Sequence, residues 1–134
     1  MKVLQRSQNN NVSLIMFNMD KNEIISKVAW FTQSKLAPQP ITQEYKERQY
    51  RFFENIVNFL QDNKLTSRKI LKKGEKATDE SQIIIGDLTE EGIKFYAFGI
   101  RKWREKYDRA KDKDKAINDF YYIEKKLKEF REKQ

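Results

Sequence analysis

Histidine and cysteine, which supply most general bases, nucleophiles and soft metal ligands in proteins, are both absent from this 134-residue sequence. Any catalysis would therefore depend on carboxylates and hydroxyls. A metal-dependent nuclease would need an acid near a strand end and a Glu-x-Lys triplet on the following strand. Glu44-Tyr45-Lys46 has that triplet within a predicted helix, however, and Asp87 has no partner strand that carries one. We therefore expect no enzymatic activity, no metal site and no cofactor.

A basic cluster between residues 68 and 76 is the first candidate binding site, and Glu75 is its acidic member. The basic residues of this cluster are Arg68, Lys69, Lys72, Lys73 and Lys76. On a flexible hairpin tip they would neutralise phosphates without reading sequence. The alternative is that lysines keep an exposed hairpin soluble and discourage pairing of its edge strands.

A second candidate is a basic stripe in the helix predicted after Thr89. Its members follow one another at steps of three and four residues, so they share one helix face: Lys102, Lys106, Arg109 and Lys113. Trp103 and Tyr107 lie beside this stripe, and basic residues flanking aromatic rings can bind single strands whose bases stack on the rings. The alternative is that both rings belong to the core and the lysines form its solvated border.

Tyr121 and Tyr122, which follow the predicted core residue Phe120, are the third candidate site. At least one of the two tyrosines should face outward from the helix. Exposed tyrosine is frequent at protein interfaces, although ordinary partial burial explains it equally well. These two residues are therefore candidates for a protein interface.

The net charge favours an anionic partner. With 28 basic and 20 acidic residues the chain has a net charge of +8, which favours nucleic acid or an acidic protein surface. The longest unbroken apolar run, Leu14-Ile15-Met16-Phe17, is far shorter than a membrane span. The polar residues 1–11 lack the apolar stretch of a signal peptide. Together with the absence of cysteine, this favours the cytoplasm and argues against a membrane partner.

Hydrophobic spacing and capping residues predict the elements that must position these sites. Asp20 and Glu23 form a capping-box pattern, Thr42 and Thr89 are predicted N-caps, and Asn63 is a predicted helix end. The expected helices cover 21–36, 43–63, a long run after Thr89, and 115–132, and the expected strands cover 12–19, 65–71 and 82–85. The pattern predicts an α+β fold in which about four helices pack on a small antiparallel sheet with a hairpin near 65–88. We expect residues 1–11 to be an extension and residues 12–134 to be a single compact domain.

Residues 64–100 resemble the winged-helix regulators of the MarR type. A strand at 65–71, a basic excursion at 72–80, a strand at 82–87 and the turn Leu88-Thr89-Glu90-Glu91-Gly92 follow that order. The resemblance implies that the basic residues of 68–76 are wing residues that touch phosphate or the minor groove. Upstream the chain departs from the family, because a single long helix at 43–63 stands where a recognition helix would be expected.

Two functions remain open, and both are forms of binding. The leading one is nucleic-acid binding through the basic hairpin and the basic stripe, because the charge and the hairpin agree. The alternative is a protein-binding inhibitor, such as an immunity protein or an antitoxin-type partner that neutralises a bacterial toxin. A compact, aromatic-rich and lysine-rich domain would suit an acidic protein partner of that kind.

Overall fold

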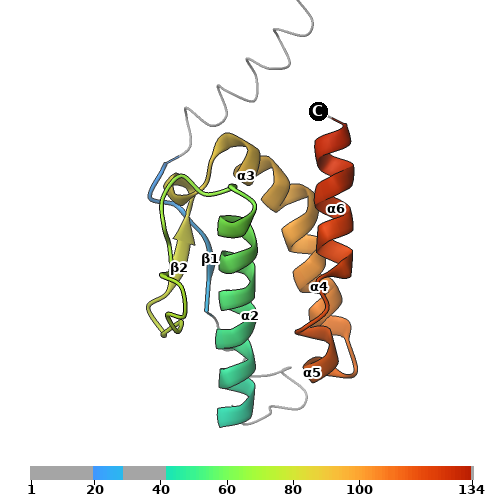
Figure 1. Cartoon of the computed structure of the whole chain (residues 1–134). Helices are drawn as coiled ribbons and strands as arrows, with labels where there is room; N and C mark the ends of the chain where they lie inside the picture. The colour runs from blue at the N-terminus through green and yellow to red at the C-terminus, as the bar shows by residue number, and fades with distance from the viewer. Residues whose placement is uncertain (1–19, 29–41, 134) are drawn as a thin grey trace, which may run out of the picture.

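The computed structural model describes residues 20–28 and 42–133, which form an α+β fold that is mostly helical (Figure 1). The strands are β1, Ile24–Lys27, and β2, Gln82–Ile84; the helices are α2, Gln43–Asp62, α3, Glu90–Phe95, α4, Arg101–Arg109, α5, Lys113–Ala116, and α6, Tyr121–Glu132. A short 3-10 turn, Ile85–Asp87, follows β2, and a π-helical turn, Tyr96–Ile100, joins α3 to α4. The predicted extension 1–11 and the predicted strand 12–19 lie outside the described residues.

The two strands form an antiparallel pair that the sequence analysis did not anticipate. Ile24 lies opposite Ile84 and Lys27 lies opposite Gln82, with an irregular register between them. The predicted helix over 21–36 is therefore wrong at Ile24–Lys27, while residues 29–36 lie outside the described part of the chain. A short run of β-branched residues fits a strand as well as a helix, and the partner strand β2 decides between them.

The predicted hairpin near 65–88 is wrong in its first strand. Residues 65–71 form no strand. The two ends of the predicted hairpin are joined only by a single antiparallel bridge between Thr66 and Leu88 within the described residues. β2, which includes most of the predicted strand 82–85, pairs with β1 instead. Residues 72–80 are therefore not flanked by two paired strands, and the wing that the resemblance implies is not formed.

Helix α2 is the central element of the core, as its wide apolar face predicts. The Thr42 hydroxyl accepts a hydrogen bond from the Tyr45 amide at 3.0 Å, and Asn63 is the C-cap. Lys64 follows with a left-handed φ of 62°, which lets the Leu65 amide donate to the Leu60 carbonyl at 2.9 Å. The buried residues of α2 are Gln49, Phe52, Phe53, Ile56, Val57, Phe59 and Leu60.

The start of α3 confirms the predicted N-cap at Thr89, although β2 ends at Ile84 and a 3-10 turn comes between strand and helix. The Thr89 hydroxyl accepts from the Gly92 amide at 3.0 Å, and Glu90 lies in the first turn near the positive end of the helix dipole. The Thr89 amide donates to the Leu65 carbonyl at 3.0 Å. A Cβ on Gly92 would lie only 2.0 Å from that carbonyl oxygen. Glycine at this position therefore lets α3 pack directly against the backbone that follows α2.

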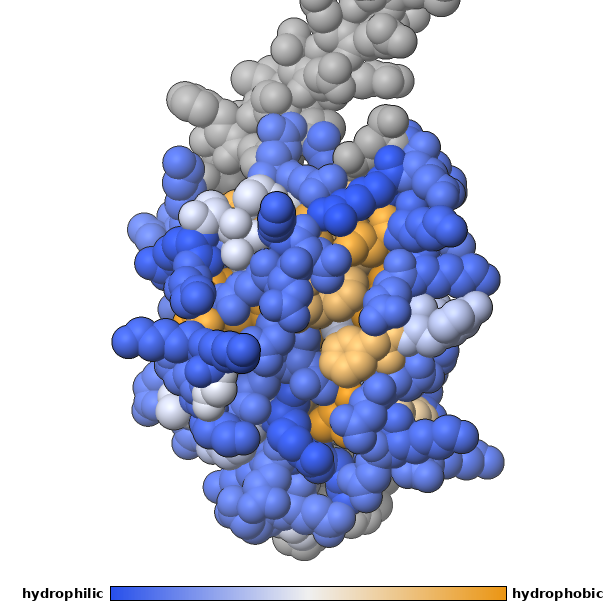
Figure 2. All heavy atoms as spheres, viewed as in Figure 1, coloured by the Kyte–Doolittle hydropathy of each residue, from blue (hydrophilic) through white to orange (hydrophobic). Residues whose placement is uncertain are grey.

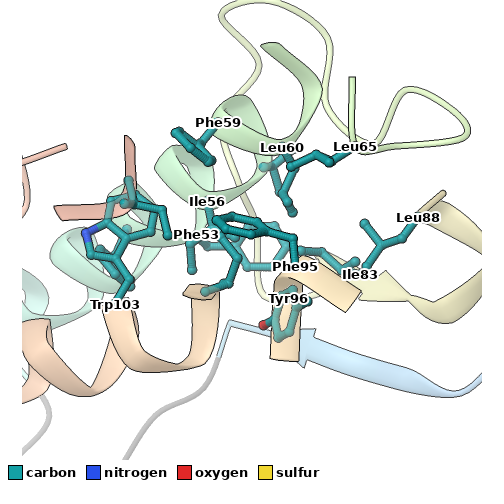
Figure 3. Packing of buried hydrophobic residues seen from close by; sticks show 14 of the residues in the cluster. Phe53, Ile56, Phe59, Leu60, Leu65, Ile83, Leu88, Phe95, Tyr96 and Trp103 are labelled. Carbon is teal, nitrogen blue, oxygen red and sulfur yellow. The ribbon is translucent and has the colours of Figure 1, made fainter. Parts of the chain in front are cut away.

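The core joins α2 to the helical run of α3 and α4 and to β2. Figure 3 shows Phe95, the last residue of α3, beside Ile56 of α2 and Ile83 of β2. Phe95 and Ile83 are fully buried. Trp103 of α4 completes the core, 5.9 Å between ring centroids from Phe59. Burial of large aromatic side chains together with many aliphatic ones stabilises this small domain.

The predicted helix over 115–132 is wrong as a single element, because it is split into α5 and α6. In a continuous helix the Ile117 carbonyl would accept from the Tyr121 amide. Instead the Asn55 side chain donates to that carbonyl at 2.7 Å, and the Tyr121 amide donates to the Asp119 carboxylate at 3.1 Å. Both groups are satisfied elsewhere, so the break costs little. The helices of the described residues therefore differ in number and bounds from the four that the sequence predicts, while the α+β class is confirmed.

Candidate nucleic-acid interface

Lysines and aromatic rings lie together at the seam between α4 and α6. The members are Phe98, Lys102 and Lys106 on the helical run that includes α4, and Tyr122 and Lys126 on α6, and we call this set the α4–α6 row. The ammonium of Lys102 lies 5.8 Å from the Phe98 ring centroid. The ammonium of Lys126 lies 5.8 Å from the Phe98 centroid and 5.6 Å from the Tyr122 centroid. The ammonium of Lys106 lies 4.6 Å from the Tyr122 centroid. Each such contact contributes about 0.5–1 kcal/mol at an exposed site.

Antiparallel packing of two helical segments builds the row. Phe98, Lys102 and Lys106 are four residues apart and share one face, and Tyr122 and Lys126 repeat that spacing on α6. α6 runs back along α4 (Figure 1), so the early part of one helix faces the late part of the other. The Phe98–Phe130 ring contact, with centroids 5.4 Å apart, closes the end of the seam.

The π-helical turn sets which residues of this segment face α6. Gly99 lies within the turn, and a Cβ there would lie 2.9 Å from two Phe95 ring atoms and 3.4 Å from the Ile123 side chain. The absence of that Cβ allows α6 to approach the buried Phe95 ring closely. One extra residue in the turn shifts the helical register, and Phe98 then lies half-buried at the seam.

A cleft of about 490 Å³ opens beside the row. It is lined by Lys102, Glu105, Lys106, Arg109, Ala110 and Tyr122. A smaller pocket of about 50 Å³ shares Lys106, Ala110 and Tyr122 with it. Within residues 20–28 and 42–133, no carboxylate forms an ion pair with Lys102, Lys106 or Arg109. The cleft therefore has a positive potential, and Glu105 is the acid on its wall.

Lys113, the fourth member of the predicted stripe, has a separate structural role. Its ammonium donates to the Tyr107 carbonyl at 2.7 Å and to the Asp108 carbonyl at 2.5 Å. It also lies 5.1 Å from the Tyr107 ring centroid. These carbonyls belong to the last turn of α4, where a cation compensates the negative end of the helix. The predicted stripe is thus divided, with Lys102, Lys106 and Arg109 at the cleft and Lys113 at the helix end.

Trp103 and Tyr107 are core residues, so the structural alternative for these rings is confirmed. Their exposed fractions are 2% and 5%. Tyr107 stacks on Phe52 with the ring centroids 4.2 Å apart. Burial raises the pKa of the Tyr107 phenol above its usual value. These rings have no free face for a nucleobase, whereas the half-buried Tyr122 lies at the surface beside them.

The basic cluster of 68–76 lies in a segment that we call the basic loop, residues 68–80. Arg68 forms an ion pair with Asp87, whose side chain is only 2% exposed and also accepts from the Ile84 amide at 3.0 Å. The other four cations are exposed: Lys69, Lys72, Lys73 and Lys76. Within the described residues none of these four ammonium groups forms an ion pair or lies over a ring, although the Lys72 backbone amide donates to the Glu75 carboxylate at 3.0 Å. One cation of the loop is therefore structural and four point to solvent.

Side chains of α2 hold the backbone of the basic loop in place. Gln61 accepts from the Ile70 amide at 2.7 Å and donates to the Leu71 carbonyl at 3.0 Å. The Ala77 amide donates to the Glu54 carboxylate at 2.8 Å. The Tyr50 hydroxyl donates to the Asp79 carboxylate. The loop therefore lies along α2 and is not the free hairpin tip that the sequence analysis expected.

The two candidate interface tyrosines differ in environment. Tyr121 is 73% exposed and is the most exposed aromatic residue in the described part of the chain. Tyr122 is half-buried in the row. Phe98 and Lys126 were missed by the sequence analysis, although they complete the row. The repeat of four residues from Tyr122 to Lys126 is the signal that would have found one of them.

The carboxylates considered for catalysis are engaged elsewhere. Glu44 forms an ion pair with Arg48, one turn further along α2, and Asp87 pairs with Arg68. Within the described ranges, no three acidic, histidine or cysteine side chains come together as a metal site would require. In the same ranges, no helix has the length and apolar character needed to cross a membrane.

Comparison with known proteins found no relative: no family model, no curated protein and no solved structure matches this chain. The functional argument therefore depends on the geometry of the row, the cleft and the basic loop.

Proposed function

We propose that this chain is a non-catalytic, cytoplasmic nucleic-acid-binding protein, and that the α4–α6 row with Arg109 is its principal binding surface. The observation that carries the proposal is the gathering of four cations, three of them near two aromatic rings and three of them on the wall of one cleft. The cations are Lys102, Lys106, Arg109 and Lys126. They come from two helices, so the positive charge extends along a surface and is not confined to one helix face.

The lysines of the row lie in defined positions before any ligand binds. Each ammonium lies within 6 Å of a ring centroid, so its rotamers are restricted in the free protein. Restricting a side chain in advance lowers the entropy cost of placing it on a ligand. Phosphate groups would meet three ammonium groups that are already gathered at one surface. By contrast, the exposed lysines of the basic loop would have to be ordered on binding.

The basic loop has a supporting role in this proposal. Its four exposed lysines raise the long-range positive potential that attracts a polyanion. They make weak and interchangeable contacts because nothing fixes their ends. Lys72, Lys73 and Lys76 therefore provide a matched comparison for the three lysines of the row.

Two triple variants with the same change in net charge test the proposal. One replaces Lys102, Lys106 and Lys126 by alanine, and the other replaces Lys72, Lys73 and Lys76. Fluorescence anisotropy of a labelled DNA oligomer is recorded over a series of salt concentrations. We expect the row variant to lower the slope of log affinity against log salt by about two, because each single-strand phosphate contact contributes about 0.7. The loop variant should change the slope by less than half as much.

Three outcomes would contradict the proposal. The first is a wild-type protein that binds no nucleic acid even at low salt. The second is equal loss of affinity in the two triple variants, because binding would then follow net charge alone. The third is a larger loss in the loop variant, which would move the binding surface to α2 and the basic loop.

A second candidate function is inhibition of a protein partner, such as a bacterial toxin. Two observations favour it. Tyr121 is 73% exposed, and a groove of about 460 Å³ lies beside the start of α6. The groove is lined by Asn55, Asn58, Phe59, Asp62, Asn63, Phe120 and Glu124. Apolar surface is visible in Figure 2 between the α2 and α6 sides of the molecule, within an otherwise hydrophilic face.

Substitution of the exposed tyrosine tests this second candidate. Exposed aromatic anchors often dominate an interface, and truncating one costs about 2 kcal/mol or more. The Tyr121→Ala variant should therefore lose a partner that wild type retains in a pull-down followed by quantitative binding. If Tyr121→Ala binds every recovered partner as tightly as wild type, the interface does not include this residue.

A further inference from the structure

Tyr122 and Phe98 differ from the other aromatic residues of the seam in what covers their rings. Buried rings such as Trp103 pack on other rings, with Phe52 at 5.2 Å between centroids. Tyr122 lies between the ammonium groups of Lys106 and Lys126. Among the described residues, its hydroxyl forms no hydrogen bond and its ring contacts no other ring. Two lysine side chains therefore cover the Tyr122 ring, and both can move away from it.

Phe98 is covered in a similar way on its outer side. Lys102 and Lys126 each lie 5.8 Å from its ring centroid, while Phe95 and Phe130 pack against it from the core. Lys126 lies within 6 Å of both rings of the row. Each ring therefore has two ammonium groups near it, and the ammonium of Lys126 is common to both.

From this arrangement we infer that the row binds single-stranded nucleic acid in preference to duplex. On binding, bases stack on Phe98 and Tyr122, and the lysines that cover these rings move to the phosphates. The inference rests on the proposed function, because it assigns the class of nucleic acid to the same surface. A single strand presents both phosphates and unstacked bases, and the row holds ammonium groups and rings within 6 Å of one another.

The exchange is favourable for each group. A lysine that leaves a ring loses a weak cation–π contact at an exposed site and gains a phosphate. The ring loses the ammonium and gains a base, whose stacking is stronger than the contact it replaces. No charge becomes buried without a partner in this exchange. The pocket beside Tyr122, lined also by Ala110 and Trp103, gives the ring room to adjust.

Duplex cannot use the rings in this way. In a duplex each base is stacked on its neighbours, so no base face is available to a protein ring without unpairing. Duplex would therefore meet only the lysines of the row and Arg109. A single strand meets the lysines and the rings together. The rings, and not the total charge, then decide the preference for single strands.

Three labelled ligands of equal length test the inference on wild-type protein. They are a thymidine oligomer, an abasic oligomer with the same number of phosphates, and a duplex. We expect the thymidine oligomer to bind at least about tenfold more tightly than the abasic oligomer, since stacking of even one base has an effect of that order. The duplex, which can use only the cations, should bind less tightly than the thymidine oligomer although it carries more phosphates. This comparison needs no variant, so it does not depend on whether a substitution disturbs the fold.

Two variants locate the stacking, with a control on the neighbouring residue. Tyr122→Leu combined with Phe98→Leu keeps apolar side chains but removes both rings, whereas Tyr121→Leu removes an exposed ring that lies outside the row. The double variant should lose the preference for the thymidine oligomer, and Tyr121→Leu should keep it. Photo-crosslinking of a halogenated uracil oligomer to wild-type protein should yield adducts on Tyr122 or Phe98.

The outcomes separate the inference from the proposed function. If the thymidine and abasic oligomers bind wild type equally, the inference is overturned, while binding through the cations stands. Adducts that map only outside the row, or equal behaviour of the double variant and Tyr121→Leu, would overturn it as well. If none of the three ligands binds even at low salt, both the inference and the proposed function fail.

Discussion

The basic loop and the α4–α6 row hold similar numbers of cations in opposite ways. In the loop, the backbone is fixed to α2 by Gln61, Glu54 and Tyr50, and the ends of the lysines are free. In the row, the ammonium groups of the lysines lie near aromatic rings, and cation–π attraction holds them there. A fixed backbone with mobile charges contributes a diffuse field, whereas fixed charges contribute a defined site. The position of positive charge in a sequence therefore does not distinguish a solvated surface from a site.

The largest expected loss of stability comes from a substitution in α3, where the helix packs against Leu65 in the segment that leads into the basic loop. Gly92→Ala would place a Cβ 2.0 Å from the Leu65 carbonyl oxygen, so α3 and the backbone after α2 must separate. We expect the free energy of unfolding to fall by about 3 kcal/mol, at the upper end of overpacking effects. Urea denaturation measures the change.

Gly74→Ala is the control for that substitution within the loop itself. Gly74 has a φ of 80° and nothing within 4 Å of an added Cβ, so only backbone strain opposes the change. This strain should cost about 1 kcal/mol. If both alanine variants lost equal stability, the close approach at Gly92 would not be limiting.

The next effect tests whether α2 holds the loop. Gln61→Ala removes the groups that satisfy the Ile70 amide and the Leu71 amide and carbonyl. We expect about 2 kcal/mol of lost stability, since net hydrogen bonds of this kind contribute about 1 kcal/mol each. Hydrogen exchange of the amides in 70–77 should accelerate more than exchange in α6. Gln61→Glu, which keeps the acceptor, should lose less; an equal loss would indicate that the acceptor is unimportant.

A smaller effect tests whether the row is ordered by its rings. Lys126→Ala removes the ammonium that lies near both Phe98 and Tyr122, and we expect about 1 kcal/mol of lost stability. Its ion pair with Glu129, three residues further along the helix, is partly exposed and contributes only a few tenths of a kcal/mol. Lys128→Ala, an exposed lysine on the same helix, should change stability by less than about 0.5 kcal/mol. Thermal unfolding of both variants gives the comparison, and equal melting temperatures would show that the rings do not hold Lys126.

The smallest effect concerns the outer end of the loop. The hydrogen bond to Asp79, with a minor contribution from burial, raises the pKa of Tyr50 in the folded protein. A raised folded-state pKa means that the hydrogen bond stabilises the fold below the unfolded pKa of about 10 and is lost as the pH rises through the raised value. Tyr50→Phe should therefore be less stable than wild type near neutral pH, and the difference should shrink above pH 10. Denaturation of both proteins over that range measures it, and a constant difference would mean that the hydroxyl does not hold Asp79.

Local signals predicted the bounds of α2 and the start of α3 well. α2 ends at Asp62, one residue before the expected end, because Thr42, Asn63 and a broad apolar face all act within one or two turns. Thr89 also starts its helix as predicted. The strand at Ile24–Lys27 was assigned to a helix, since its partner strand lies far along the chain and only pairing distinguishes the two. The break before Tyr121 depends on Asn55, which belongs to another helix.

Half of the candidate site could be found from spacing alone. Lys102, Lys106 and Arg109 share a face of one helix, and the sequence placed them together. Lys126 joins them only because α6 returns along α4, whereas Phe98, four residues before Lys102, lies on their side of the same helical run. Lys113 does not belong to the candidate site, because its ammonium donates to two backbone carbonyls at the end of α4.

The sequence by itself determined the positive charge, the lack of histidine and cysteine, the capping residues and the apolar faces of the long helices, because each of these depends on composition or on neighbours along the chain. Only the tertiary structure decided which lysines lie on rings, which loop is held to α2 and which strands pair. These depend on contacts between residues far apart in sequence, which a local pattern does not contain. The two basic regions look alike as sequence, and packing makes them different.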